Sequence, residues 1–126
     1  MLVGQQAESR EGSSSSLAGR QAKRFHVNQR IPVGVLGGGL RFTGEMIDIS
    51  SNGIMIECPM DIPVGTVVRL GISFGHRTAR IVATARRCIP GVGTAFEFLH
   101  MHYADREMIH HLLLQLATSA LTPKTV

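Results

Sequence analysis

The segment Leu40-Arg-Phe-Thr-Gly-Glu-Met-Ile-Asp-Ile-Ser-Ser-Asn-Gly-Ile-Met-Ile-Glu-Cys58 contains two β-strand patterns separated by a short polar turn. Residues 40–49 and 54–58 are rich in apolar and β-branched side chains, which favour strands. The turn between them ends in Asn52 and Gly53, two residue types that are able to adopt positive φ. We therefore predict a β-hairpin with Asp48-x-Ser50-x-x-Gly53 at its tip.

Strand patterns with a period of two continue on both sides of this hairpin. Residues 25–35 predict one strand before it, and Pro32 places at least part of that strand on an edge. Further strands are predicted over residues 68–74, 78–88 and 93–99, and in the second of these Arg80, Thr84 and Arg86 are expected to point outward. Residues 105–121 carry apolar side chains at helical spacing, with Pro123 just beyond. The chain is predicted to be all-β: a six-stranded antiparallel β-barrel with a C-terminal α-helix.

Length and charge indicate one domain with a local concentration of positive charge. The 126 residues suffice for a single core and carry a formal net charge of +4. Residues 1–19 hold almost no apolar side chains and include Ser13 to Ser16, so we expect a disordered N-terminal tail. Residues 20–30 hold Arg20, Lys23, Arg24 and Arg30 and no acidic residue. This concentration favours a small anionic ligand over a long polyanion.

The two cysteines, Cys58 and Cys88, do not have the spacing of a known motif, and the sequence shows no secretory signal pattern. We therefore expect a cytoplasmic protein with reduced thiols. No apolar run has the length of a membrane span.

The order of the motifs resembles the PilZ domain family, the bacterial receptors for cyclic di-GMP. Arg20-Gln-Ala-Lys-Arg24-Phe25 is similar to the arginine motif that enters the family's first strand, and Asp48-Ile-Ser50-Ser-Asn-Gly53-Ile54 is similar to its second motif. The resemblance covers residues 20–121 and leaves residues 122–126 as a C-terminal tail. It implies a PilZ-type barrel, no catalytic activity and no cofactor.

The chemistry of these residue types suits the ligand that the resemblance implies. A guanidinium group binds the O6 and N7 acceptors of guanine bidentately, which assigns Arg20 and Arg24 to the ligand. Asp48 is able to accept from guanine N1–H and N2–H2, and Ser50 is able to donate to an oxygen. Gly53 is expected to serve the backbone geometry of the turn. The plainer alternatives are a solvated basic linker and a turn that only closes the hairpin. Ligand contact is preferred for the arginines because the linker precedes the fold and lacks the acidic partners that a salt-bridge role would need.

Other functions have weaker support. His100-x-His102 and His110-His111 lack a third ligand for a metal site. The basic residues Arg77, Arg80, Arg86 and Arg87 suggest RNA, but the chain has few aromatic side chains for base stacking. The sequence lacks the patterns that would indicate an enzyme. It has no Ser or Cys nucleophile with a patterned base, no facing pair of carboxylates and no phosphate-binding loop.

We therefore expect a cyclic di-GMP effector whose arginine linker becomes ordered on the barrel and changes its interaction with a downstream protein. The alternative is a degenerate relative that binds another protein, for example in pilus biogenesis, without nucleotide.

Overall fold

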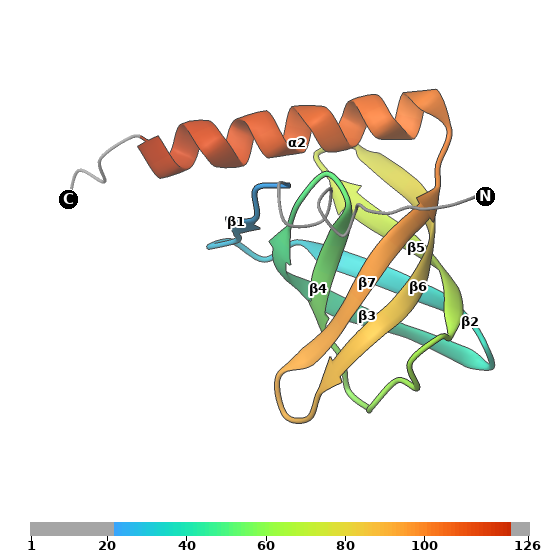
Figure 1. The fold of residues 1–126 in the computed structure, drawn as a ribbon. Coiled ribbons are helices and arrows are strands. Elements are labelled where there is room, and N and C mark those ends of the chain that lie inside the picture. The colour runs from blue at the N-terminus through green and yellow to red at the C-terminus, as the bar shows by residue number, and fades with distance from the viewer. Residues whose placement is uncertain (1–21, 122–126) are drawn as a thin grey trace, which may run out of the picture.

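The computed structural model describes residues 22–121, so the N-terminal tail predicted over residues 1–19, Arg20 and the tail 122–126 lie outside the described residues. Figure 1 shows a barrel with one helix lying across an end. The elements are β1 (Phe25–His26), β2 (Pro32–Gly37), β3 (Leu40–Ile49), β4 (Gly53–Glu57), β5 (Val67–Phe74), β6 (Arg77–Ile89), β7 (Gly93–His100) and α2 (Tyr103–Leu121).

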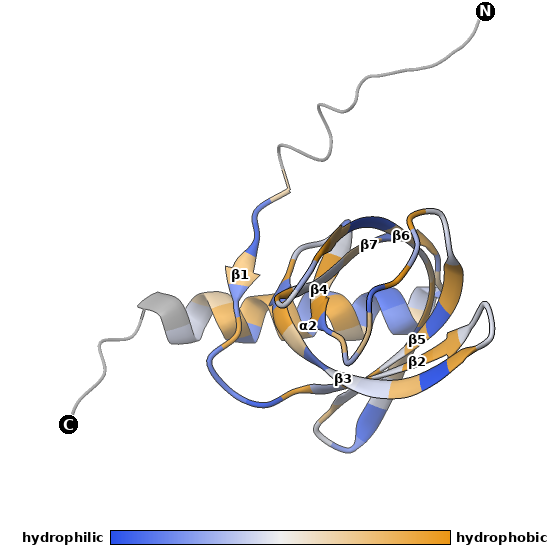
Figure 2. Cartoon of the chain, turned by 90° about the horizontal axis from the view of Figure 1, so that it is seen from below, coloured by the Kyte–Doolittle hydropathy of each residue, from blue (hydrophilic) through white to orange (hydrophobic). Residues whose placement is uncertain are grey.

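Six strands close into a barrel in the order β3-β2-β5-β6-β7-β4, because β4 also pairs with β3. Every pairing is antiparallel. The view along the barrel in Figure 2 shows these strands as a closed ring with α2 crossing behind it. The predicted six-stranded antiparallel barrel with a C-terminal helix is confirmed. No helix within residues 22–121 combines the length and the hydropathy needed to cross a bilayer.

The strand predicted over residues 25–35 is divided into β1 and β2, and both parts pair with β3. The Val27 amide donates to the Ile47 carbonyl at 3.0 Å, and the Met46 amide donates to the Ile31 carbonyl at 3.0 Å. Residues 28–30, between these two bonds, are exposed. Three consecutive polar side chains, Asn-Gln-Arg, cannot keep a period of two against an apolar core, and the strand is interrupted there.

The alternation predicted for β6 is also only partly correct. Ala83, Thr84 and Ala85 are all buried, so Thr84 does not have the exposed position that was expected. The pairing of β6 with β7 shifts register between Val82 and Ala83 and again between Ala85 and Arg87. Such irregularities bend a strand and redirect its side chains, which a simple period-two pattern does not reveal.

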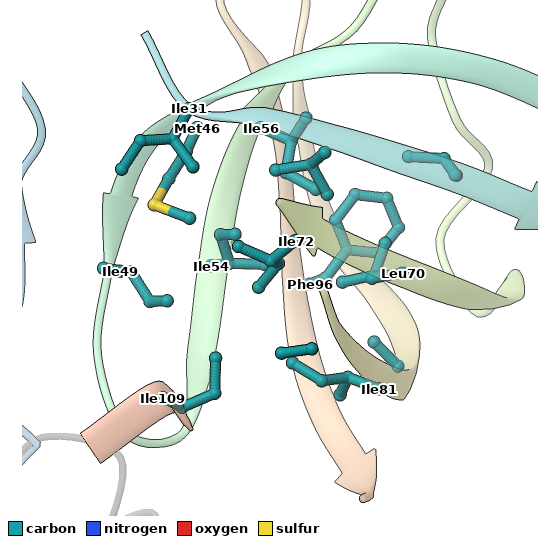
Figure 3. Packing of buried hydrophobic residues seen from close by; sticks show 14 of the residues in the cluster. Ile31, Met46, Ile49, Ile54, Ile56, Leu70, Ile72, Ile81, Phe96 and Ile109 are labelled. Atoms are coloured by element: carbon teal, nitrogen blue, oxygen red, sulfur yellow. The ribbon is translucent and has the colours of Figure 1, made fainter. Parts of the chain in front are cut away.

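The barrel interior is filled by apolar side chains from β2 to β7, mostly aliphatic, with Phe96 contributed by β7. The close-up in Figure 3 shows part of this cluster. Ile49, Ile54 and Ile72 are fully buried. The helix α2 covers the open end, and its buried side chains Ile109 and Leu112 belong to the same cluster. The amphipathic pattern expected for this helix therefore closes the core.

Gly44 of β3 lies where the backbone of β4 passes too close for a side chain. A Cβ at this position would overlap the Glu57 carbonyl oxygen and lie 2.6 Å from Cγ2 of Ile56. We expect Gly44→Ala to lower the free energy of unfolding by about 1–3 kcal/mol, because strand separation or overpacking has to accommodate the methyl group. Chemical denaturation of the two proteins measures this difference.

Gly34→Ala is the matched control for Gly44→Ala. A Cβ at Gly34 would meet nothing closer than the Gly71 carbonyl oxygen at 3.9 Å, so this variant should be as stable as the parent or slightly more stable. Equal losses in both variants would show that the β3–β4 contact is not the cause.

Candidate functional site

The pairing of β1 with β3 brings the arginine linker to the tip of the β3–β4 hairpin. Phe25 lies opposite Ile49, and His26 lies opposite Asp48. Arg24 directly precedes β1, so it lies beside the Asp48-x-Ser50-x-x-Gly53 turn. Two motifs that are more than twenty residues apart in the chain therefore form one site.

Arg24 and Asp48 are joined directly. The Nε and Nη2 atoms of Arg24 both donate to Oδ1 of Asp48, at 3.0 and 2.7 Å. The Arg24 side chain is 47% exposed and that of Asp48 is 27% exposed, so water reaches both groups. The expectation that this linker lacks an acidic partner is wrong for Arg24, because the partner comes from the end of β3.

Ser50 holds the turn together from inside the protein. Its side chain is fully buried, and its Oγ accepts from the amides of Asn52 and Gly53, both at 3.2 Å. Its own amide donates to the Gly53 carbonyl at 2.9 Å. The turn is also tied to β7, because the Phe98 amide donates to the Asn52 carbonyl at 2.8 Å. The local role considered for Ser50, closing the hairpin, is therefore what the structure displays.

A neighbouring strand requires glycine at position 53. The turn pattern suggested a positive φ for Gly53, but its φ is not positive. A Cβ on Gly53 would overlap the carbonyl oxygen of Phe96 in β7. Gly53 and Glu97 are paired across β4 and β7 at this point. The glycine thus allows the hairpin tip to lie directly against β7.

A cavity of about 550 Å³ lies beside the turn, within the usual size range for small-molecule sites. Arg24, Ser50 and Gly53 line it, and Asp48 borders it through the ion pair with Arg24. The structure thus brings together four of the five predicted site residues, and the fifth, Arg20, lies outside the described residues.

Two further arginines line this cavity that the motif pattern did not assign to it, Arg86 from β6 and Arg106 from the first turns of α2. Arg86 is the extra residue of a bulge, since Ala85 lies opposite Phe96 and Arg87 opposite Ala95. The bulge directs Arg86 toward the cavity, where it forms an ion pair with Glu97. In the sequence, the one sign of this bulge is that two arginines, Arg86 and Arg87, are adjacent within a predicted strand.

The cavity therefore combines three guanidinium groups with two carboxylates. Arg24 is paired with Asp48 and Arg86 with Glu97. Arg106 has no ion-pair partner within the described part of the chain. The site carries net positive charge, together with acceptors that can receive N–H donors, so it suits a ligand with both phosphate groups and purine edges.

The other reactive side chains do not form a second centre. Among residues 22–121, no three His, Cys, Asp or Glu side chains gather as a metal site would require. The rings of His100 and His102 lie 6.1 Å apart. Burial raises the pKa of the Cys58 thiol, and its Sγ lies 3.4 Å from the Ile56 carbonyl oxygen, so it stays a neutral thiol at neutral pH.

Fold and site together define a small β-barrel module with an arginine-lined cavity where its N-terminal linker meets the hairpin tip. The chain belongs to the PilZ domain family, because the model of that family, described as PilZ domain, matches residues 19–115. A search of curated protein sequences gives no match.

Several solved structures share the fold at low sequence identity. The PilZ domain of CeSA from a cellulose-synthesizing bacterium is 21% identical, with 75% of this chain and 98% of that chain covered and a TM-score of 0.59. The PilZ domain of YcgR from Escherichia coli, solved with c-di-GMP, is 15% identical, with 80% and 93% covered and a TM-score of 0.61.

The Bacillus subtilis inhibitor of motility, MotI/DgrA, is 18% identical with a TM-score of 0.64. The match covers 82% of this chain and 53% of that one, so this chain spans about half of its length. At these identities the likeness establishes the fold alone.

The contacts of Ser50 generate a stability prediction. Ser50→Ala should lower the free energy of unfolding by about 1–3 kcal/mol, because two amides at a buried position lose their acceptor. Ser51→Ala is the control, since the Ser51 side chain is exposed and its hydroxyl donates to the neighbouring Asn52 side chain. Thermal and urea unfolding compare the variants, and equal stability of Ser50→Ala and Ser51→Ala would contradict a structural role for the Ser50 hydroxyl.

Proposed function

We propose that the protein is a receptor for cyclic di-GMP that binds the nucleotide in the cavity beside the hairpin tip. The observation that carries this proposal is the joining of both motifs there, with Arg24 held by Asp48 at the edge of a cavity that Arg86 and Arg106 also line. Family membership supports the ligand class. The YcgR domain, solved with c-di-GMP, has the same fold.

Recognition of guanine would use groups that are already in place. Both donors of Arg24 now contact one oxygen of Asp48, Oδ1, so the carboxylate retains capacity to accept from guanine N1–H and N2–H2. The planar guanidinium of Arg24 fits guanine O6 and N7 bidentately. The two side chains recognise complementary edges of the same base type.

The ion pair between Arg24 and Asp48 is a small obstacle to binding. Pairs between exposed groups contribute about 0–1 kcal/mol, since water screens them and both side chains lose freedom. Charge-assisted bonds to a phosphate or a base inside a cavity are stronger than that. The free protein therefore holds Arg24 close to its binding position, and the ligand replaces part of the contact.

The phosphates of the ligand would lie among the remaining cations. Arg106 has no ion-pair partner among residues 22–121, and Arg86 is 63% exposed despite its pair with Glu97. Arg20, four residues before Arg24, would add a further guanidinium from the linker. Binding then orders the linker against the barrel and alters the surface that a partner protein meets. The change is one of binding and shape, without a chemical step on the ligand.

Replacing the linker arginines tests the site. The double variant Arg20→Ala/Arg24→Ala should lose measurable cyclic di-GMP binding in calorimetry, while the melting temperature changes little because Arg24 is half exposed. Asp48→Asn should weaken binding by about 1–3 kcal/mol, since it removes a charged acceptor.

Arg30→Ala is the matched control for these variants. Arg30 lies between β1 and β2 and also forms an exposed ion pair, with Glu45 at 3.2 Å, but it does not line the cavity. The affinity of the Arg30→Ala variant for cyclic di-GMP should equal that of the parent protein. Unaltered binding by the Arg20/Arg24 double variant would refute the proposed site.

The ordering step predicts a change in hydrogen exchange. Amides of residues 20–24 should exchange more slowly with cyclic di-GMP bound, because the linker must lie over the cavity for Arg20 to reach the ligand. Leu70 and Ile72, which are buried in β5, should be protected in both states. Mass spectrometry of exchanged peptides measures both, and full protection of residues 20–24 in the free protein would exclude ordering as the switch.

A further inference from the structure

A second and larger cavity, of about 910 Å³, lies along the outward-facing side of β2, β3, β5 and β6 and reaches the start of α2. It is distinct from the candidate nucleotide site, and the two share only His100 and Met101. The glycines and arginines discussed below are among its lining residues.

The floor of this groove is formed by two glycines, Gly34 and Gly71, that lie directly opposite each other on β2 and β5. Neither has a positive φ. A Cβ on Gly34 would come no closer than 3.9 Å to another atom, and one on Gly71 would make ordinary contact with Thr78 at 3.5 Å. The backbone therefore does not require glycine at either position, although glycine weakens a strand. Because the two glycines have no side chains, they leave a trough in a face of the sheet that side chains cover elsewhere.

One rim of the trough is a cross-strand row in which cations alternate with aliphatic side chains. The pairings place Arg41 opposite Leu36, Leu36 opposite Arg69, and Arg69 opposite Val82. Leu36 is 50% exposed, so its side chain is available for apolar contact between the two arginines. The row thus offers charge and apolar contact at regular spacing.

The groove has an excess of positive charge that the described chain does not neutralise. Within residues 22–121, Arg41, Arg69 and Arg80 form no ion pair. The single carboxylate among the lining residues is Asp105, whose Oδ1 accepts from the Arg80 amide at 3.1 Å. An acidic partner would supply the missing charges.

We infer that this face is a docking surface for an acidic amphipathic α-helix of a partner protein. Arg41 and Arg69 are two strands apart, about 9.6 Å at ~4.8 Å per strand. Carboxylates at positions i and i+7 of a helix are about 10.5 Å apart and match this spacing. In an extended peptide, side chains on one face repeat every ~6.8 Å and do not match.

The helix would place its apolar residues at i+3 and i+4 over Leu36 and the trough formed by Gly34 and Gly71. The missing side chains allow the helix to approach the sheet closely. Single-stranded RNA fits less well, because Phe42 is the one Phe, Tyr or Trp among the described lining residues, and it is partly buried against the core, so it offers no open stacking platform.

The test uses the full chain and a fluorescein-labelled, three-heptad peptide with Glu at i, i+7 and i+14 and Leu at i+3 and i+4 of each heptad. Fluorescence anisotropy should show saturable binding, at least tenfold tighter than for a peptide of the same composition in scrambled order. The inference is overturned if the scrambled peptide binds equally well. It is also overturned if a labelled single-stranded RNA of equal charge binds as tightly as the designed peptide.

Variants separate docking from general attraction. Arg41→Glu/Arg69→Glu should weaken peptide binding at least tenfold, whereas Arg77→Glu/Arg87→Glu, with the same change in charge outside the groove, should weaken it less than threefold. If the two double variants behave alike, the inference fails. Should the reversal disturb folding by circular dichroism, Arg41→Ala/Arg69→Ala replaces it with the same criterion.

Gly34→Val fills the trough without altering charge and should also weaken peptide binding at least fivefold. Parent-like binding by Gly34→Val overturns the role of the trough. Arg24→Ala should bind the peptide normally, so a failure of docking and a failure of the nucleotide site are distinguishable.

Discussion

The structure depends on the closure of the barrel at β4, a strand of five residues that pairs with β3 on one side and β7 on the other. This closure is tight enough that side chains are excluded at three positions. A Cβ on Gly44 would overlap the Glu57 carbonyl oxygen, one on Gly53 that of Phe96, and one on Gly93 that of Ile56. Because an unclosed barrel would expose two sheet edges, these glycines keep the domain a single closed unit.

The candidate site follows from this closure. The hairpin that leads into β4 has its tip held by Ser50 and fixed to β7 through the Asn52 carbonyl. The same end of β3 also receives β1, which delivers Arg24. Asp48 therefore lies at a fixed point between a rigid turn and the end of a linker. A ligand bound there would contact both the hairpin turn and the residues that directly precede β1.

Much of this was predictable from the sequence, because most strands carry a period of two and the apolar residues of the helix recur at helical spacing. The turn motif and the arginine motif led to the prediction of a site at the hairpin tip, and the register of β1 places Arg24 beside that turn. The sequence did not reveal the Arg24–Asp48 pair, which depends on the register of β1 against β3. Arg86 depends on a bulge, and Arg106 on the position of α2 over the barrel end. Those are tertiary relations between residues that no local pattern links.

The pairing of charges at the cavity bears on selectivity. Two of the three arginines at the cavity, Arg24 and Arg86, are already paired with carboxylates. A ligand that brings only negative charge could bind Arg106, but at Arg24 or Arg86 it would have to displace Asp48 or Glu97 and leave that carboxylate without its partner. A ligand with phosphates and guanine N–H donors would replace both lost partners. Its phosphates would pair with the arginine, and its N–H groups would donate to the released carboxylate. Under the proposed function, the two ion pairs of the free state would therefore favour a guanine nucleotide over a simple anion at Arg24 and Arg86, at the low cost that exposed pairs impose.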